Sequence, residues 1–268
     1  MQLIDGQKIA EDIKKEIATE VRQTKKQPAL AVVLVGSNEA SWSYIRQKEK
    51  AAGEVGFLFC KYIFKEKDKE KDILKTIEWL NEDKEINGIM VQLPLPEKFN
   101  TEKILQKISP KKDVDSLTKK SSFKAPFIGS IIRCLKETNE DLKDKKILAL
   151  VNSDLFGQKL QTCFKKEEGW SLDYFLSNKS QKDKIKKADV LISAIGQPNS
   201  IKGSSIKKDT ILIDSGISRQ AGEIMGDIEP IAVSKKAAWL APVPGGVGPV
   251  TVALLLKNTF LAYQQQNI

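Results

Sequence analysis

Short apolar runs alternating with amphipathic stretches constrain this chain most, because they recur along nearly its whole length. Each run is rich in Val, Ile and Leu and is bounded by Gly, Pro, Ser or charged residues, as buried parallel strands are. We expect strands at residues 29–35, 86–93, 146–151, 189–193 and 210–213. Helical patterns lie at residues 6–24, 41–55, 69–82, 101–108 and 250–264. This alternation predicts an α/β fold with parallel sheets.

The strands fall into two series, which predicts two α/β domains. The first domain is expected at residues 1–120 and the second at residues 121–249. A polar segment at residues 117–126, with Pro126 at its end, suits a crossing between domains. The last helix, within residues 250–268, is expected to pack back on the first domain.

Histidine is absent, which excludes Ser-His-Asp and Cys-His catalysis and every His-ligated metal site. General acid–base chemistry must then use Lys, Tyr, Asp or Glu. Cys60, Cys134 and Cys163 fit neither a zinc spacing nor a disulfide framework, so we expect reduced thiols and no metal.

The net charge of +9 comes from lysines without interleaved aromatic residues, which favours solvated surfaces over a nucleic-acid interface. A small anionic ligand is compatible with this charge. No apolar run approaches the roughly 20 residues that a membrane span needs, and the N-terminus shows no signal-peptide pattern. We therefore expect a cytoplasmic protein without a nucleic-acid or membrane partner.

Tyr44 and Lys48 are four residues apart in an expected helix and so share one face of it. The helix follows the strand that ends before Gly36, and ligands bind at this carboxyl edge of parallel sheets. A lysine in such a place can have a lowered pKa and carry protons. The alternative is a purely structural pair. The same spacing occurs in short-chain dehydrogenases, but there it follows a complete nucleotide-binding half, so the order excludes that family.

Three further motifs lie near expected strand ends or helix starts. Gln92 has an amide that could orient a neutral lysine, or else it caps the turn before Pro94. Asp115 offers a carboxylate to an amidine-like edge such as that of a pterin, or else it caps a turn. The glycine- and proline-rich stretch 242–251 suits a loop whose backbone approaches a ligand closely, or else a helix entry.

Taken in order, these motifs resemble the bifunctional methylenetetrahydrofolate dehydrogenase/methenyltetrahydrofolate cyclohydrolase family from end to end. They are Ile-Asp-Gly near the start, Val-Gly-x-x-x-Ala-Ser-x-x-Tyr-x-x-x-Lys, Val-Gln-Leu-Pro-Leu, Lys-Asp-Val-Asp, Gly-Gln-Pro and Pro-Val-Pro-Gly-Gly-Val-Gly-Pro-x-Thr. The resemblance implies a folate-binding catalytic domain, a Rossmann-like NAD(P)-binding domain, an active cleft between them and a homodimer.

The resemblance also implies residue roles on the folate side. Lys48 would activate the water that opens the methenyl bridge, Tyr44 would stack on the aminobenzoyl ring, and Gln92 would tune Lys48. Asp115 would anchor the pterin. The folate site would also include Leu93, Pro244, Gly245, Gly246 and Thr251.

On the nucleotide side, the resemblance implies that NADP, or NAD, is bound by residues that follow the strands of the second domain. These are Asn152, Ser153, Gly157, Ser177, Ala194, Gly196, Gln197, Gly216 and Ile217. Lys159, Lys165 and Lys166 are either replacement positive charges for the dinucleotide or solvated helix lysines.

Two departures from the family pattern keep alternatives open. Val151 and Asn152 stand where the family usually has Gly and Arg, and Lys159 stands where it has Pro. The loop that begins at Ser116, where the family has Gly, is shortened through residue 130. The sequence therefore predicts a bifunctional enzyme, with a cyclohydrolase that has lost its dehydrogenase step, or a non-catalytic folate-binding subunit, as alternatives.

Overall fold

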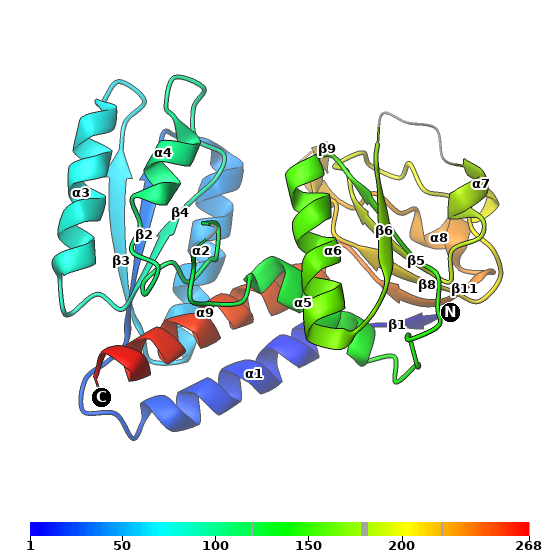
Figure 1. Ribbon diagram of the computed structural model, residues 1–268, viewed down its shortest axis with the longest axis horizontal. Helices are drawn as coiled ribbons and strands as arrows, with labels where there is room; N and C mark the ends of the chain where they lie inside the picture. The colour runs from blue at the N-terminus through cyan, green and yellow to red at the C-terminus, as the bar shows by residue number, and fades with distance from the viewer. Residues whose placement is uncertain (119, 178–181, 221, 268) are drawn as a thin grey trace. The chain divides into compact units, whose positions relative to one another are not determined.

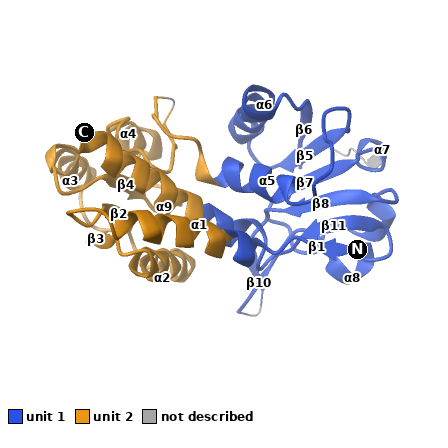
Figure 2. Cartoon of the chain, turned by 90° about the horizontal axis from the view of Figure 1, so that it is seen from below, with its two compact units in different colours: residues 1–9, 127–251 blue, residues 10–126, 252–268 orange. Residues whose placement is uncertain are grey.

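The computed structural model describes residues 1–268 except 119, 178–181, 221 and 268 (Figure 1). The chain forms two compact units, which Figure 2 colours separately. Unit 1 contains residues 1–9 and 127–251, and unit 2 contains residues 10–126 and 252–268. Each unit is thus assembled from segments that are distant in the sequence. Within the described residues, no helix is both long and apolar enough to cross a membrane.

Unit 2 is built on a parallel sheet of three strands in the order β3-β2-β4 (Figure 1). The central strand β2, Ala29–Val35, is buried at all seven positions, which explains its continuous apolar sequence. Its neighbours are β3, Leu58–Phe64, and β4, Gly88–Val91. The helices that lie wholly or mostly in this unit are α1 (Gly6–Val21), α2 (Glu39–Glu54), α3 (Glu70–Glu82), α4 (Thr101–Gln106) and α9 (Val247–Gln266).

Strand β4 corrects the strand expected at residues 86–93, which is too long at both ends. Gln92 still donates its backbone N–H to the Val33 carbonyl at 2.9 Å, but the ladder stops there. The next residues are Leu93 and Pro94, and proline has no N–H to continue a sheet. The strand therefore ends where Gln92 leaves it.

Helix α9 packs on unit 2, as the sequence predicted for the last helix. The buried Asn258 donates its side-chain amide to the carbonyls of Val114 and Lys124, at 2.8 Å each. Near the helix end, the Gln266 side chain donates to the Asn87 carbonyl at 2.9 Å. Without Asn258, both carbonyls would lose their donor in a buried place, which would cost folding free energy. Asn258 therefore holds α9 against the segments that contain Val114 and Lys124.

Unit 1 contains a parallel sheet of six strands in the order β1-β11-β8-β7-β5-β6. This order, with strands on both sides of β5 and β7, confirms the Rossmann-like character expected of the second domain. In sheet order the strands are Gln2–Leu3, Ala237–Ala241, Thr210–Asp214, Val190–Ala194, Ile147–Val151 and Leu172–Leu176. The helices are α5 (Pro126–Lys136), α6 (Asp154–Glu168), α7 (Lys182–Ile185) and α8 (Pro230–Val233), with a hairpin formed by β9 (Ser218–Gln220) and β10 (Glu223–Met225).

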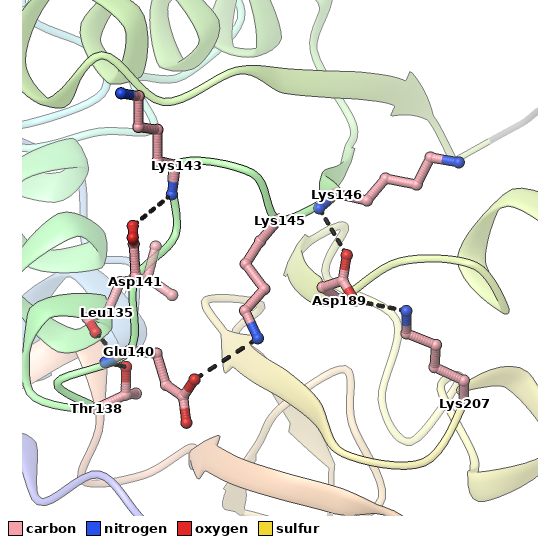
Figure 3. A network of polar contacts seen from close by, with 9 residues as sticks. All are labelled: Leu135, Thr138, Glu140, Asp141, Lys143, Lys145, Lys146, Asp189 and Lys207. Atoms are coloured by element: carbon pink, nitrogen blue, oxygen red, sulfur yellow. Dashed lines mark hydrogen bonds and ion pairs between the residues drawn. The ribbon is translucent and has the colours of Figure 1, made fainter.

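A polar network at the amino ends of β5 and β7 sets the start of these strands (Figure 3). Asp189 accepts the backbone N–H of Lys146 at 2.7 Å and the Lys207 ammonium at 2.5 Å. Burial opposes ionisation of Asp189, but these two partners together with Lys145 hold the pKa of its carboxyl below the usual value. The preceding turn is closed by Thr138, whose hydroxyl donates to the Leu135 carbonyl at 2.7 Å. These contacts lie at the amino ends of the strands, away from the carboxyl ends, and they stabilise the fold.

Candidate functional site

Lys48 and Gln92 meet in unit 2. The Lys48 ammonium donates to the Gln92 side-chain oxygen at 2.9 Å and lies 3.4 Å from the Met90 sulfur. The Gln92 side-chain nitrogen in turn donates to the Leu93 carbonyl at 2.7 Å. Because that second bond fixes the direction of the amide, its oxygen is the atom presented to Lys48.

Helix α2 carries both Lys48 and Tyr44 on one face. The helix begins after Asn38, whose side chain accepts the backbone N–H of Ser41 at 3.0 Å, as an N-cap residue does. Both Tyr44 and Lys48 are partly buried. The sequence prediction that this face begins just after β2 agrees with the short connection between Val35 and the helix.

Burial lowers the pKa of the Lys48 ammonium, and the negative charge of Asp115 opposes that shift. Asp115 is therefore close enough to Lys48 for its charge to act on the amine. A lysine with a lowered pKa is more often neutral, and a neutral amine accepts a proton. The arrangement thus supplies a base held by an amide and balanced by a carboxylate.

Asp115, which is partly buried, is carried by a loop that its neighbours fix firmly. Asp113 is buried and accepts the backbone N–H and the hydroxyl of Thr118, at 3.0 and 2.7 Å. Lys112 donates its ammonium to the carbonyls of Leu80 and Asp83, at 2.9 and 2.6 Å, at the end of α3. Within the Lys-Asp-Val-Asp motif, the side chains of Lys112 and Asp113 therefore shape the loop that carries Asp115.

The glycine-rich loop before α9 lies in unit 1 and touches the start of α1. A Cβ on Gly6 would lie 1.8 Å from the Gly246 carbonyl oxygen, so the two backbones are in direct contact. Gly245 has φ of +103°, and Gly246 donates its N–H to the Pro242 carbonyl at 2.8 Å. Thr251 shares a 2.8 Å hydrogen bond with Ser130 of α5. A Cβ on Gly246 would meet the Pro242 carbonyl oxygen at 2.6 Å, so close packing accounts for this glycine, and the positive φ accounts for Gly245.

The first strand–helix turn of unit 1 runs from β5 into α6. Asn152 is exposed, and Ser153 caps the helix by accepting the N–H of Phe156 at 3.4 Å. Gly157 is buried against Tyr174, where an added Cβ would meet ring carbon Cδ2 at 2.2 Å. Ser177, after β6, donates its N–H to the Val151 carbonyl at 3.0 Å. The sites predicted from the sequence thus surround the carboxyl ends of β5 and β6, where dinucleotides bind in this fold.

The next two strands of the same sheet bring together the other predicted nucleotide-side residues. Ala194 ends β7, and Gly196 follows with φ of +68°. A Cβ on Gly196 would lie 3.9 Å from the Ile217 carbonyl oxygen, so the loop after β7 and the loop after β8 are neighbours. Glycine at position 196 permits the left-handed backbone that this turn adopts.

The sequence pattern includes Asp214 and Asp227 among the residues that follow strands of the second domain, but it gave neither carboxylate a role in the site. Both are buried and shape these loops. Asp227 accepts the N–H groups of Ile195 and Gln197, at 2.8 and 2.7 Å. The signal available in the sequence was an Asp close to a Gly at the end of one strand, Asp214 with Gly216, and the same pair of residue types again at Gly226 and Asp227. Only the glycine and isoleucine of the first group were predicted as site residues.

Comparisons with known proteins give family matches for most of the chain. Residues 4–115 match the catalytic domain, and residues 127–267 the NAD(P)-binding domain, of the tetrahydrofolate dehydrogenase/cyclohydrolase family. Bifunctional protein FolD of Geotalea daltonii is 40% identical over 273 residues, which cover 96% of this chain and 97% of that protein. The FolD protein of a Hydrogenobaculum species is 38% identical over 99% of this chain and its own whole length.

Solved structures give the same result for the fold. The bifunctional FolD enzyme of Campylobacter jejuni superposes with a TM-score of 0.92 at 32% identity, covering 99% of both chains. The FolD enzyme of Trypanosoma brucei, solved with an NADP cofactor and an inhibitor, has a TM-score of 0.91 at 29% identity and covers 98% of this chain and 97% of its own. With both domain matches and relatives this similar along the full length, the chain belongs to the tetrahydrofolate dehydrogenase/cyclohydrolase family.

Proposed function

We propose that this protein oxidises 5,10-methylenetetrahydrofolate to the 5,10-methenyl form with NAD(P) and then hydrolyses that product to 10-formyltetrahydrofolate. The observation that carries the proposal is the Lys48 amine, held 2.9 Å from the Gln92 oxygen within the electrostatic reach of Asp115. Residues 1–120, with the last helix within 250–268, carry the folate chemistry. Residues 121–249 bind the dinucleotide.

In the hydrolytic step, the neutral Lys48 amine accepts a proton from a water molecule while the oxygen of that water attacks the methenyl carbon. The tetrahedral intermediate then breaks its bond to folate nitrogen N5, which takes up a proton, and the formyl group stays on N10. One water is consumed and one proton is released overall. Gln92 keeps the amine directed at the reacting carbon, and the pterin is anchored by Asp115, with Tyr44 and Leu93 beside the substrate.

In the oxidative step, NAD(P) supplies the acceptor for the hydride that leaves the methylene carbon. The residues present fit such a dinucleotide, because Asn152 and Gly196 follow β5 and β7 at the carboxyl ends of the strands, and Gly196 adopts the left-handed backbone of a tight turn. Ser153, Ser177 and Gln197 are placed around the same sheet edge. For the folate, the proposal includes Pro244, Gly245 and Gly246 in the loop before α9, and Thr251 in the first turns of α9.

The deciding experiment measures the initial rate of nicotinamide reduction by the purified protein with methylenetetrahydrofolate, in parallel with NADP and NAD. Hydrolysis of methenyltetrahydrofolate is followed in the same preparation through the loss of its absorbance. Reduction with either dinucleotide, together with hydrolysis, supports the bifunctional assignment. Folded protein that does neither contradicts it.

A second candidate, a cyclohydrolase without the dehydrogenase step, is favoured by the turn into α6. Asn152 replaces the arginine expected by family resemblance, and Asp154 puts a carboxylate in the first turn of the helix, where it accepts the Tyr174 hydroxyl at 2.8 Å. A negative charge there opposes the binding of a phosphate at the helix N-terminus. Hydrolysis without reduction of either dinucleotide would select this candidate.

Changing Asp115 to alanine is expected to raise the KM for the folate about tenfold or more, because a carboxylate that bonds a pterin edge is lost. The KM for the dinucleotide should stay within about twofold, since Asp115 belongs to the folate side. An Asp115→Asn variant gives a second test, the pH dependence of hydrolysis. Loss of the negative charge lets the Lys48 pKa fall further, so the rise of hydrolysis with pH should move to lower pH. Equal losses for both substrates would contradict the anchor role.

Changing Asn152 to arginine is expected to raise the preference for NADP over NAD, measured as the ratio of kcat/KM values, by about tenfold. The guanidinium restores a bidentate partner for the 2′-phosphate that asparagine cannot provide. An Asn152→Ala variant is the control and should leave the ratio near that of the wild type. No change in the arginine variant would show that the phosphate is bound elsewhere.

Family resemblance extends the proposal to a homodimer that acts in the cytoplasm, without a nucleic-acid partner, in the one-carbon metabolism that supports purine biosynthesis. Size-exclusion chromatography with light scattering tests the assembly. A mass of two chains supports the dimer, and a mass of one chain contradicts it.

A further inference from the structure

Two buried carboxylates, which the mechanism above does not use, stand at the carboxyl edge of the unit 1 sheet. Asp214 ends β8 and is 1% exposed, and Asp227 follows β10 and is 0% exposed. A buried carboxylate is costly unless its oxygens are bonded, so each should have several donors. Both do, and the donors come from different loops.

Asp227 gathers the loop that follows β7. One carboxylate oxygen accepts the Ser193 hydroxyl at 2.7 Å and the Ile195 N–H at 2.8 Å. The other accepts the Gln197 N–H at 2.7 Å. Every group that these contacts bring to the carboxylate is a hydrogen-bond donor. A single side chain therefore fixes the backbone on both sides of Gly196.

Asp214 holds Asp227 in place. Its carboxylate accepts the N–H groups of Gly216 and Asp227, at 3.1 Å each, and of Ile228 at 2.9 Å. Burial raises the pKa of the Asp214 carboxyl to about 7, and the negative charge of Asp227 acts in the same direction. The hydrogen bonds from the three N–H groups lower this pKa but do not cancel the rise.

The packing between the two carboxylates and two glycines is reciprocal. A Cβ on Gly216 would lie 2.0 Å from the Asp227 carboxyl carbon, and one on Gly226 would lie 2.1 Å from an Asp214 oxygen. A larger residue at either glycine would displace a carboxylate. The ends of β7 and β8 are therefore locked together through these two side chains.

The direction of the peptide groups shows what the loop presents to a ligand. In a planar trans peptide, the C=O points opposite to the N–H. Since the N–H groups of Ile195 and Gln197 point at Asp227, the carbonyls of Ala194 and Gly196 point away from it. Carbonyl oxygens only accept hydrogen bonds, so they suit a ligand with N–H or O–H donors.

We propose that Asp227 is a positioning residue for the dinucleotide, and that it aims the Ala194 and Gly196 carbonyls at the carboxamide NH₂ of the nicotinamide. This inference rests on the proposed dehydrogenase function. Asp227 does not touch the ligand itself. Its effect is to hold two acceptors at the correct spacing before the ligand arrives, which avoids the cost of ordering the loop on binding.

The test compares the dissociation constants of NADP and of its 3-acetylpyridine analogue, measured by isothermal titration calorimetry. The analogue has a methyl ketone where NADP has the carboxamide, so it lacks the donors. The wild-type protein should bind NADP about tenfold more tightly than the analogue, as expected for a lost hydrogen bond to acceptors already in place. In Asp227→Asn, binding of NADP should weaken about tenfold and the preference for NADP should fall to about twofold or less.

Asp189→Asn is the matched control, because Asp189 also accepts a backbone N–H but lies at the opposite edge of the same sheet. It should keep the wild-type preference. Hydrolysis of methenyltetrahydrofolate by Asp227→Asn should stay within about twofold of wild type, a split that general unfolding would not produce. Unchanged NADP binding in Asp227→Asn, or a preference for NADP as large as that of wild type, would overturn the proposal.

If Asp227→Asn does not fold, Ser193→Ala decides, because it removes one donor from the carboxylate and keeps the carboxylate itself. It should weaken NADP binding about threefold and reduce the preference, and an unchanged preference would overturn the proposal. Binding is measured without turnover. Wild-type protein that binds NADP with this preference but reduces none would contradict the dehydrogenase function and leave the positioning role standing.

Discussion

Replacing Lys48 with methionine is expected to slow the hydrolysis of methenyltetrahydrofolate by about a thousandfold, within the range that a positioned general base contributes. Methionine keeps most of the volume of the side chain but has no amine to accept the proton of water. The buried Gln92 oxygen loses its 2.9 Å donor, which costs some stability. Removing the desolvated Lys48 amine acts in the opposite direction, so the thermal unfolding midpoint should change far less than the rate.

Lys50 provides a matched control, because it is an exposed lysine on the same helix. Lys50→Met should hydrolyse the substrate at the wild-type rate. In the wild type, the rate should rise with pH as Lys48 loses its proton, because the neutral amine is the base. Burial lowers the pKa of Lys48, which places this rise below the pH at which an exposed lysine titrates. Turnover retained by Lys48→Met would rule out the assigned role.

Replacing Gly6 with alanine is expected to lower the free energy of unfolding by about 2–4 kcal/mol, the scale of an overpacked contact that has to be relieved. The new Cβ would stand 1.8 Å from the Gly246 carbonyl oxygen and 2.7 Å from that of Gly245. Both are backbone atoms and cannot rotate away as a side chain does. Either the start of α1 or the glycine loop must move.

Gly53→Ala is the comparison variant, because Gly53 is also helical and a Cβ there would meet nothing within 4 Å. This substitution should leave stability equal or raise it by about 0.5 kcal/mol, since alanine favours a helix over glycine. Urea unfolding of both variants, followed by circular dichroism, measures the difference. Equal stability of Gly6→Ala and wild type would show that the contact between the two backbones is not tight in solution.

Buried strands could be predicted from the sequence because burial on both faces requires an unbroken run of apolar residues. Strand β2 is buried at every residue and was predicted with its observed bounds. Strands β3 and β6 were missed, since each lies at a sheet edge, is partly exposed and carries a charged residue, Lys61 or Asp173. Strand β11, Ala-Ala-Trp-Leu-Ala, was missed because its alanine content is typical of a helix.

The candidate site shows a similar limit. The order of motifs indicated Lys48 and Gln92, and the structure places them in hydrogen-bond contact. No local pattern could show that Asp227 serves the loop after β7, because its partners at Ile195 and Gln197 lie 32 and 30 residues earlier in the chain. Contacts of that range depend on the order of the strands in the sheet.

The way the chain closes each unit has a consequence for synthesis on the ribosome. The first strand, β1, pairs with β11, which ends at Ala241, and the loop that carries Asp115 is fixed by Asn258. Unit 1 is therefore incomplete until β11 has been translated, and unit 2 until α9 has been translated. A chain that stops before Ala237 lacks part of both units, and one that stops before Asn258 leaves the loop that carries Asp115 without this anchor.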